Sequence, residues 1–196
     1  MINLFDQSES SNDFQHVLDQ AGHDITINEE DARAVITNVK LNINVDYDDR
    51  YISTLHDIKR GDVIDYNSRK WIILSEVEAM RHHKYKAIMR HLTHNIQVKI
   101  GEENEIVDYD RFGRPIYGDI VPIYKNIGAY AEQRRMVTTS GLIRAVDGDI
   151  MLTVSDNEDA QLIEQNHEFD FGGNMFRIYG IDKTQKGLLI LNCERK

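Results

Sequence analysis

The stretch GDVIDYNSRKWIILSEV, residues 61–77, decides the fold class of this chain of 196 residues. A short apolar run from Asp62 to Tyr66 is followed by Asn67-Ser68 and then by a second run that Trp71 leads. Asn and Ser favour turns, so two such runs around them predict a β-hairpin with a polar turn of about four residues. Aromatic side chains close to the turn are expected to pack on a neighbouring sheet.

A second stretch, NHEFDFGGNMFRIYGID at residues 166–182, follows the same pattern. At a constant offset, aromatic or apolar residues and one aspartate correspond: Ile64 with Phe169, Asp65 with Asp170, Tyr66 with Phe171, Trp71 with Phe176 and Ile73 with Ile178. Two interpretations stay open. The chain contains a duplicated unit, or two hairpins of an all-β protein share a common pattern.

Period-two alternation continues through much of the chain and predicts further strands at 24–27, 34–45, 85–93 and 187–193. A hairpin is expected over 140–154 around Asp147-Gly148, a pair suited to a type I′ turn. Residues 47–60 are expected to form an irregular or weakly helical connection. One short helix is expected, with Ser11, Asn12 or Asp13 as its N-cap, with Phe14, Val17 and Leu18 on one face, and with Gly22 after its end.

These patterns predict a mainly β fold of antiparallel β-barrel or sandwich units with one short N-terminal helix. Residues 1–23 would form an N-terminal arm and the helix, and residues 24–100 a first barrel-like domain. The polar GEENE segment at 101–105, with both prolines and two glycines close behind it, predicts a loop or linker over 101–134. Residues 135–196 would form a second β domain.

The composition limits the classes of protein that the chain can belong to. Its hydrophobic fraction of 41% is sufficient for a packed core. The single cysteine, Cys193, excludes an intrachain disulfide framework and a Cys/His zinc site. No basic and apolar leader opens the chain, and no apolar run reaches the roughly 18 residues that span a bilayer. A net charge of −10 disfavours nonspecific binding to phosphate backbones.

The sequence contains no GxSxG, P-loop, GxGxxG or HExxH motif, so we expect no enzyme, no catalytic residues and no bound cofactor. A β-fold hydrolase would need a catalytic group that the sequence does not identify. Four histidines cluster at His82, His83, His91 and His94, but no acidic residue accompanies them, and we expect no metal site there. The acidic clusters at 46–49, 102–105 and 156–159 are expected to be solvated turns. Arg60-Gly61-Asp62 is expected to be a turn into the next strand.

Two segments are candidate interfaces. Arg111, Phe112, Arg114 and Tyr117 occur together in DRFGRPIYGD, and these residue types are enriched at interface hot spots. This segment either meets a partner or folds onto its own barrel. The second segment is the one strongly basic part of an acidic chain, with Arg81, Lys84, Lys86 and Arg90, and it would face an acidic partner or nucleic acid.

The N-terminal half resembles the head–tail joining proteins of tailed bacteriophages. The likeness is carried by LDQAGHDITINEEDARAVITNV, by RGDVIDYNSRKWIILSEVE and by YKAIMRHLTH, over roughly residues 15–98. Members of that family are small barrels that form rings between portal and tail, and this chain departs from them in having a second β unit. The resemblance implies a structural role and no catalytic residues.

The sequence therefore predicts a structural virion protein of the phage neck, namely a connector, a stopper or a tail-completion protein. Its expected partners are copies of itself in a sixfold or twelvefold ring, portal or adaptor proteins and tail proteins. DNA would pass through the ring without sequence-specific binding, no membrane would be involved, and assembly would occur in the host cytoplasm. The alternative is a phage regulatory protein that binds nucleic acid through the basic strand.

Overall fold

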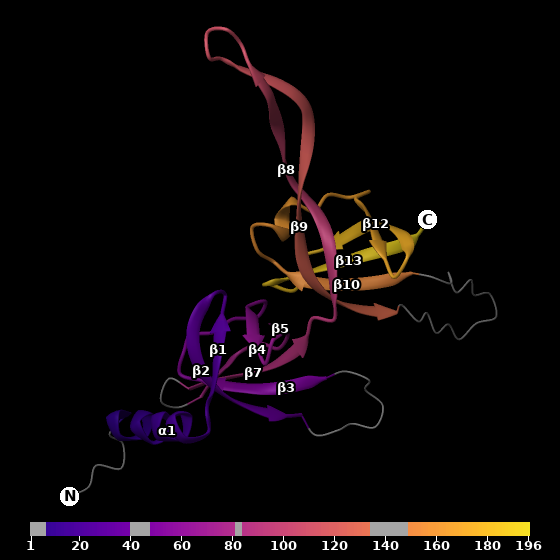
Figure 1. The fold of residues 1–196 in the computed structure, drawn as a ribbon. Coiled ribbons are helices and arrows are strands. Elements are labelled where there is room, and N and C mark those ends of the chain that lie inside the picture. Colours follow the sequence, from indigo (N-terminus) through magenta and orange to yellow (C-terminus); the bar gives the residue numbers. More distant parts are fainter. Residues whose placement is uncertain (1–6, 40–47, 81–83, 134–148) are drawn as a thin grey trace, which may run out of the picture.

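The computed structural model describes residues 7–39, 48–80, 84–133 and 149–196. Its fold is mainly β, with antiparallel barrel architecture and one helix, as the sequence predicts. Two β units follow one another along the chain, and a long hairpin projects from the second unit at the opposite end of the molecule from the helix (Figure 1).

The first unit, barrel 1, is a closed six-stranded barrel. Its strands are β1 (His23–Ile27), β2 (Glu30–Asn38), β3 (Asp49–Thr54), β4 (Val63–Tyr66), β5 (Arg69–Ile73) and β7 (Lys84–His91). The sheet order β3-β2-β1-β4-β5-β7 closes because β3 also pairs with β7. The short β6 (Glu78–Met80) pairs with β7 outside this ring. Apolar side chains on alternate positions fill the interior, among them Ile52, Ile64, Trp71 and Met89.

The second unit, barrel 2, contains β8 (His94–Tyr109), β9 (Pro115–Gln133), β10 (Ile150–Ser155), β11 (Glu168–Phe171), β12 (Asn174–Asp182) and β13 (Leu188–Arg195). The sheet order is β11-β12-β13-β10-β9-β8. A short 3-10 helix, η2 (Ala160–Leu162), precedes β11. Between the described parts of β8 and β11 no backbone pairing occurs. Instead, His94 stacks on Phe171 at 4.6 Å, and His167 Nε2 lies 2.9 Å from the carbonyl oxygen of Gln97.

Around the barrel, the strands of the two units follow one another in the same cyclic order. In this comparison the strands of barrel 1, in chain order, are matched with those of barrel 2, so that β1 corresponds to β8 and β7 corresponds to β13. The position where the described part of barrel 2 lacks pairing, between β8 and β11, corresponds to the β1–β4 pair of barrel 1. The two similar stretches, 61–77 and 166–182, form equivalent hairpins, because Ile64 pairs with Trp71 in one and Phe169 pairs with Phe176 in the other. His23 pairs with Ala34, and His94 pairs with Ala129. These shared registers favour duplication of one unit over two unrelated hairpins.

Each repeated hairpin has a two-residue turn, shorter than the four residues expected. Asn67 and Ser68 have φ values of 52° and 59°, and Gly172 and Gly173 have values of 62° and 79°. Left-handed conformations at both central positions are typical of type I′ turns, whose twist fits the flanking strands. The sequence thus predicted the position of both turns correctly but overestimated their length.

Several expectations about individual elements are wrong. Helix α1 (Gln7–Ala21) begins earlier than expected, so Ser11, Asn12 and Asp13 lie within it and are not its cap. Leu18 is buried but Val17 is 43% exposed, so the expected apolar face is incomplete. Residues 49–54, expected to be irregular, form β3, whose Ile52 and Thr54 point into barrel 1.

The largest correction concerns the expected linker at 101–134. Within its described residues, 101–109 belong to β8 and 115–133 to β9, so GEENE is strand and only 110–114 connect the two. Other expectations are met in part. The strand expected at 34–45 is confirmed for 34–38, the strand expected at 71–77 ends at Ile73, and the strand expected at 85–93 is β7. Residues 40–45 and the Asp147-Gly148 turn lie outside the described residues.

Candidate interaction site

The most unusual feature is the part of the β8–β9 hairpin beyond barrel 2, residues 99–124, which we call the arm (Figure 1). In barrel 1 the equivalent hairpin is closed tightly, because Ile27 pairs with Glu30 across the two residues Asn28 and Glu29. The corresponding pair in barrel 2 is Val98 with Lys125. The arm therefore stands where a two-residue turn would be enough to connect β8 with β9, so the fold of barrel 2 does not explain its length.

The arm exposes apolar side chains on both of its faces. Adjacent residues of a strand point to opposite faces, and neighbours such as Ile120 and Val121 are 60% and 46% exposed. An isolated two-stranded hairpin is marginally stable in water, and a concentration of exposed apolar residues is typical of an interaction site. The large exposed apolar residues of the arm are Ile106, Val107, Tyr109, Phe112, Ile116, Tyr117, Ile120, Val121, Ile123 and Tyr124.

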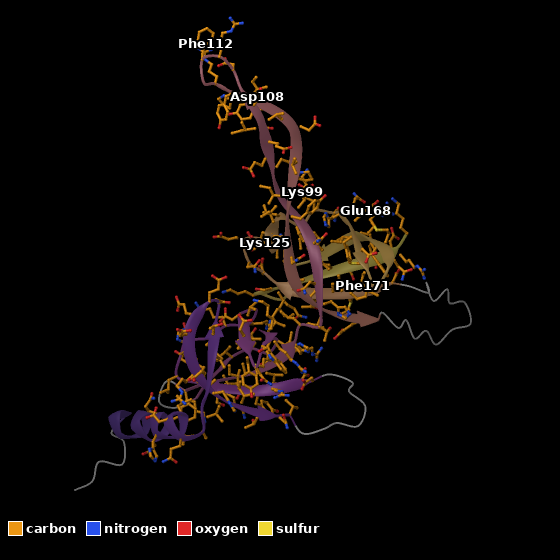
Figure 2. All side chains as sticks on the ribbon, viewed as in Figure 1. Lys99, Asp108, Phe112, Lys125, Glu168 and Phe171 are labelled. Carbon is orange, nitrogen blue, oxygen red and sulfur yellow. The ribbon has the colours of Figure 1, made fainter. Side chains whose placement is uncertain are left out.

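The tip of the arm is a shaped turn. Asp110 Oδ1 accepts hydrogen bonds from the backbone N–H groups of Phe112 and Arg114, at 2.7 and 2.9 Å. Gly113 has a φ of 75°, a conformation that glycine adopts without strain. Phe112, 78% exposed, lies at the far end of the arm (Figure 2). The segment does not fold onto its own barrel, and its contact with a partner stays a prediction.

All four candidate residues of this segment lie at or near the tip. Arg111, Phe112 and Arg114 belong to the turn, and Tyr117, 59% exposed, follows on β9.

The charges of the arm are unevenly distributed. Lys99 pairs with Glu102, whose carboxylate raises the pKa of the lysine, and Lys125 at the base pairs with Asp159. Figure 2 shows Lys99 and Lys125 at the base and Asp108 closer to the tip. Among the described residues, no ion pair neutralises the remaining acidic residues between base and tip: Glu103, Glu105, Asp108 and Asp119.

The basic strand predicted from sequence is divided between two environments. Arg90 donates to Asp49 Oδ1 and Oδ2 at 2.7 and 3.0 Å, and to Glu132 Oε1 of barrel 2 at 2.9 Å. Burial alone would lower the pKa of Arg90, but the hydrogen bond and charge of Asp49 raise it above its usual value. Arg90 therefore links the two barrels.

The lysines of the same strand are placed differently. Lys84 Nζ lies 4.2 Å from the ring centroid of Phe14, and Lys86 Nζ lies 4.6 Å from that of Tyr51. Neither lysine is in an ion pair with any residue that the structure describes. Arg81, the remaining candidate, lies outside the described residues.

The two histidines of this segment that the structure describes, His91 and His94, do not converge. His91 contacts Trp71 of barrel 1, with ring centroids 5.3 Å apart, whereas His94 contacts Phe171 of barrel 2. Burial lowers the pKa of both imidazoles. His82 and His83 lie outside the described residues. Within the described ranges, no three His, Cys, Asp or Glu side chains are grouped so that they could hold a metal ion.

Residues of the three acidic clusters form ion pairs or lie in a strand. Asp48 pairs with Arg50 and Arg69, and Asp159 with Lys125. Glu102, Glu103 and Glu105 lie in strand β8, so the expected solvated turn at 102–105 is wrong. The Arg60-Gly61-Asp62 turn is confirmed, with a φ of 92° at Gly61.

A polar cleft of about 430 Å³ lies between the barrels. Four of its five charged side chains form ion pairs, because Lys70 lies 3.4 Å from Asp65 and Lys125 pairs with Asp159, whereas Glu29 forms none with a described residue. The other lining residues include Asn28, Asn95, Asn126 and Ser155. The arrangement offers hydrogen bonds but no reactive group with an adjacent base.

Fold and surface together define a protein of two tandem β-barrels with a projecting arm. The chain belongs to the YomX family, because the model of the YomX N-terminal domain matches residues 3–91 and that of the YomX C-terminal domain matches residues 82–194. The two matches overlap at residues 82–91, a range that contains β7 of barrel 1. YomX is a phage-derived family of SPBeta-like prophages, which agrees with the predicted phage origin.

Two solved chains are similar, both of the protein MrkH. One is a complex of K. pneumonia MrkH with c-di-GMP, at 12% identity over 97% of this chain and 85% of that chain, with a TM-score of 0.22. The other, described as a c-di-GMP-dependent transcription regulatory factor, has 12% identity over 97% and 83% and a TM-score of 0.21. Such TM-scores carry no argument about this chain. No curated protein matches it. In its described part, no helix has the length and apolar character that a membrane crossing requires.

Proposed function

We propose that this chain is a structural protein of the phage neck, where it joins portal-side and tail-side rings around the DNA channel. The observation that carries the proposal is the arm, an exposed apolar ribbon that barrel 2 does not need for its own closure. Its partners would be copies of the same chain, portal or adaptor proteins and tail proteins. The protein would act by shape and contact, without catalysis, in a virion assembled in the host cytoplasm.

Two further features support the proposal. The family is phage-derived, and the chain carries a net charge of −10. Carboxylates that line a channel do not bind the phosphate backbone of passing DNA, so the genome could move through it. The regulatory alternative loses support, because Arg90, one of the four cations of the basic segment, is held by Asp49 and Glu132.

Deletion of the gene from an inducible prophage tests the proposal. Negative-stain images of the lysate should show filled or leaking heads that lack tails, and the intact gene supplied in trans should restore tailed particles. A gene in which Asn-Gly replaces residues 99–124 should fail to restore them. Normal tailed virions after the deletion would exclude the neck role.

A further inference from the structure

The unneutralised carboxylates of the arm have a counterpart on the outer face of barrel 1. We infer that the arm of one copy docks on the outer face of β3 and β7 of a second copy, with its acidic residues against Lys84 and Lys86. This inference deepens the proposed function, because it names the contact between neighbouring copies that a ring requires.

The outer face of β3 and β7, which we call the acceptor face, combines positive charge with apolar surface. Alternation along β7 directs Lys84, Lys86 and Ile88 outward, since Ala87 and Met89 between and beyond them are buried in barrel 1. Tyr51 of β3 is the cross-strand partner of Ile88, and both are half-buried. Lysines held over aromatic rings keep their charge at the surface while their stems cover apolar groups.

Among the described residues of barrel 1, no acidic side chain forms an ion pair with the acceptor lysines. Glu78 of β6 is the cross-strand neighbour of Lys86, but no ion pair joins them. Ser53 is the neighbour of Lys86 on the other side, in β3, and carries no charge. Two cations two residues apart on one strand are therefore available to carboxylates from outside the barrel.

The arm offers the complementary surface. Glu103 and Glu105 lie two positions apart in the sequence of β8, as Lys84 and Lys86 do on β7, although the register of β8 with β9 shifts between Asn104 and Ile106. The opposite strand of the arm is mostly apolar, with Ile120, Val121 and Ile123 exposed. Apolar contact with the Tyr51 and Ile88 side of the face would remove both surfaces from water, and the charge pairs would fix the orientation.

The arm projects from barrel 2 away from barrel 1, which carries the acceptor face (Figure 1). An arm therefore meets this face on another copy, and each copy offers one donor and one acceptor surface. Such a head-to-tail contact generates a closed ring where the rotation between copies closes, and an open chain where it does not.

Pairing between two arms is a less favourable arrangement. Two β8 strands side by side would place like charges against each other, because Glu102, Glu103, Glu105 and Asp108 all lie on that strand. The β9 strand contains Pro115 and Pro122, which have no N–H to donate to an added strand.

Sedimentation velocity of the purified full-length protein tests the inference. The wild type should associate as its concentration rises, and less so at high salt. Glu103→Lys/Glu105→Lys and Lys84→Glu/Lys86→Glu should each weaken association by on the order of tenfold or more, because two attractive pairs become repulsive. An equal mixture of the two variants should associate again, since each then meets an opposite charge.

Lys183→Glu/Lys186→Glu is the matched control for the lysine reversal, because both lysines are exposed in barrel 2, away from the acceptor face. It should associate as the wild type does. Circular dichroism should show that every variant keeps its β structure.

A wild type that stays monomeric would overturn the inference. So would a Lys84→Glu/Lys86→Glu variant that still associates, since contact between arms would then explain the oligomer. Neither result decides the neck role, because the tail-less phenotype of the deletion is measured independently of self-association.

Discussion

Gly61 and Gly187 allow a close backbone approach between the barrels. A Cβ atom at Gly61 would lie 1.8 Å from the carbonyl oxygen of Gly187, and one at Gly187 would lie 2.0 Å from that of Arg60. Both glycines also have positive φ values, 92° and 87°. Neither position has room for a side chain, so the contact between the barrels depends on two glycines that face each other.

Gly61→Ala should lower the free energy of unfolding by on the order of 2–4 kcal/mol, from backbone strain and steric overlap together. Gly172→Ala is the matched control, because Gly172 also has a positive φ, 62°, but open space around it. It should lose only about 1 kcal/mol. Chemical denaturation of both variants measures the difference, and equal losses would show that the Gly61–Gly187 contact contributes nothing.

Cys193 is fully buried in barrel 2, and burial, with the nearby charge of Asp149, raises the pKa of its thiol to about 12. The thiolate fraction at pH 8 is then roughly one in ten thousand. Iodoacetamide should therefore label the native protein very slowly at pH 8 and label it rapidly in denaturant. Fast labelling of the native state would contradict the buried position.

The same pKa shift affects stability at high pH. The folded pKa of Cys193 lies above the unfolded value of about 8.5, so the protonated thiol stabilises the fold below that pH. This contribution is lost as the pH rises from about 8.5 toward 12.

The arm is a long two-stranded hairpin whose side chains are mostly exposed to solvent. Its apolar residues contribute little to either core, because they lie outside the buried clusters of the two barrels. Val98 and Lys125, at its base, are already paired and in position for a tight turn. The arm can therefore be removed with little effect on the fold that carries it.

Replacement of residues 99–124 by Asn-Gly should leave the free energy of unfolding within about 1 kcal/mol of the wild type, because Asn-Gly suits a type I′ turn. Thermal unfolding followed by circular dichroism measures this. The full-length variant Phe112→Ser/Tyr117→Ser is the control for loss of apolar surface without a change of length. Collapse of barrel 2 after the replacement would show that the arm is part of its core.

The sequence predicted correctly those elements in which the hydrophobic pattern and the turn residues match the observed structure. The hairpins at 63–73 and 168–182 combine period-two alternation with turn residues at the correct sites, and both are present, with turns shorter than predicted. The arm was missed because GEENE is polar and two prolines follow it, which are signals of a loop. Hydrophobic alternation marks a strand only where one of its faces is buried. Residues 102–109 have no buried face, so this pattern could not identify them as a strand.

Predictions about the site failed for a different reason. Arg90 was expected on a basic surface, but its partner Glu132 is 42 residues away in sequence and belongs to the other barrel. Only the three-dimensional arrangement of the barrels reveals such a pair. The residue types of the tip predict an interface segment, and the structure shows that the tip is exposed, but the interface itself stays a prediction.

The protein as a whole depends on the junction between its barrels. Ile72 of barrel 1, Leu188 of barrel 2 and Leu92 between them form a small buried cluster. Arg90 extends this junction, since it pairs with Asp49 within barrel 1 and with Glu132 and the ring of Tyr130 in barrel 2. A rigid junction would hold the arm at a fixed distance from the acceptor face, as a regular ring requires.

Glu132→Gln tests whether Arg90 couples the barrels. It removes the charge pair across the junction but keeps the Arg90–Asp49 pair, so we expect a loss of about 1 kcal/mol in the free energy of unfolding. The wild type should unfold as one cooperative unit, with calorimetric and van't Hoff enthalpies that agree, whereas the variant should show a calorimetric enthalpy that exceeds the van't Hoff value. Glu194→Gln is the matched control, because it breaks the pair with Arg177 inside barrel 2 alone. If both variants melt alike in the calorimeter, the junction does not depend on Arg90, and the buried cluster of Ile72, Leu92 and Leu188 must hold the barrels together without it.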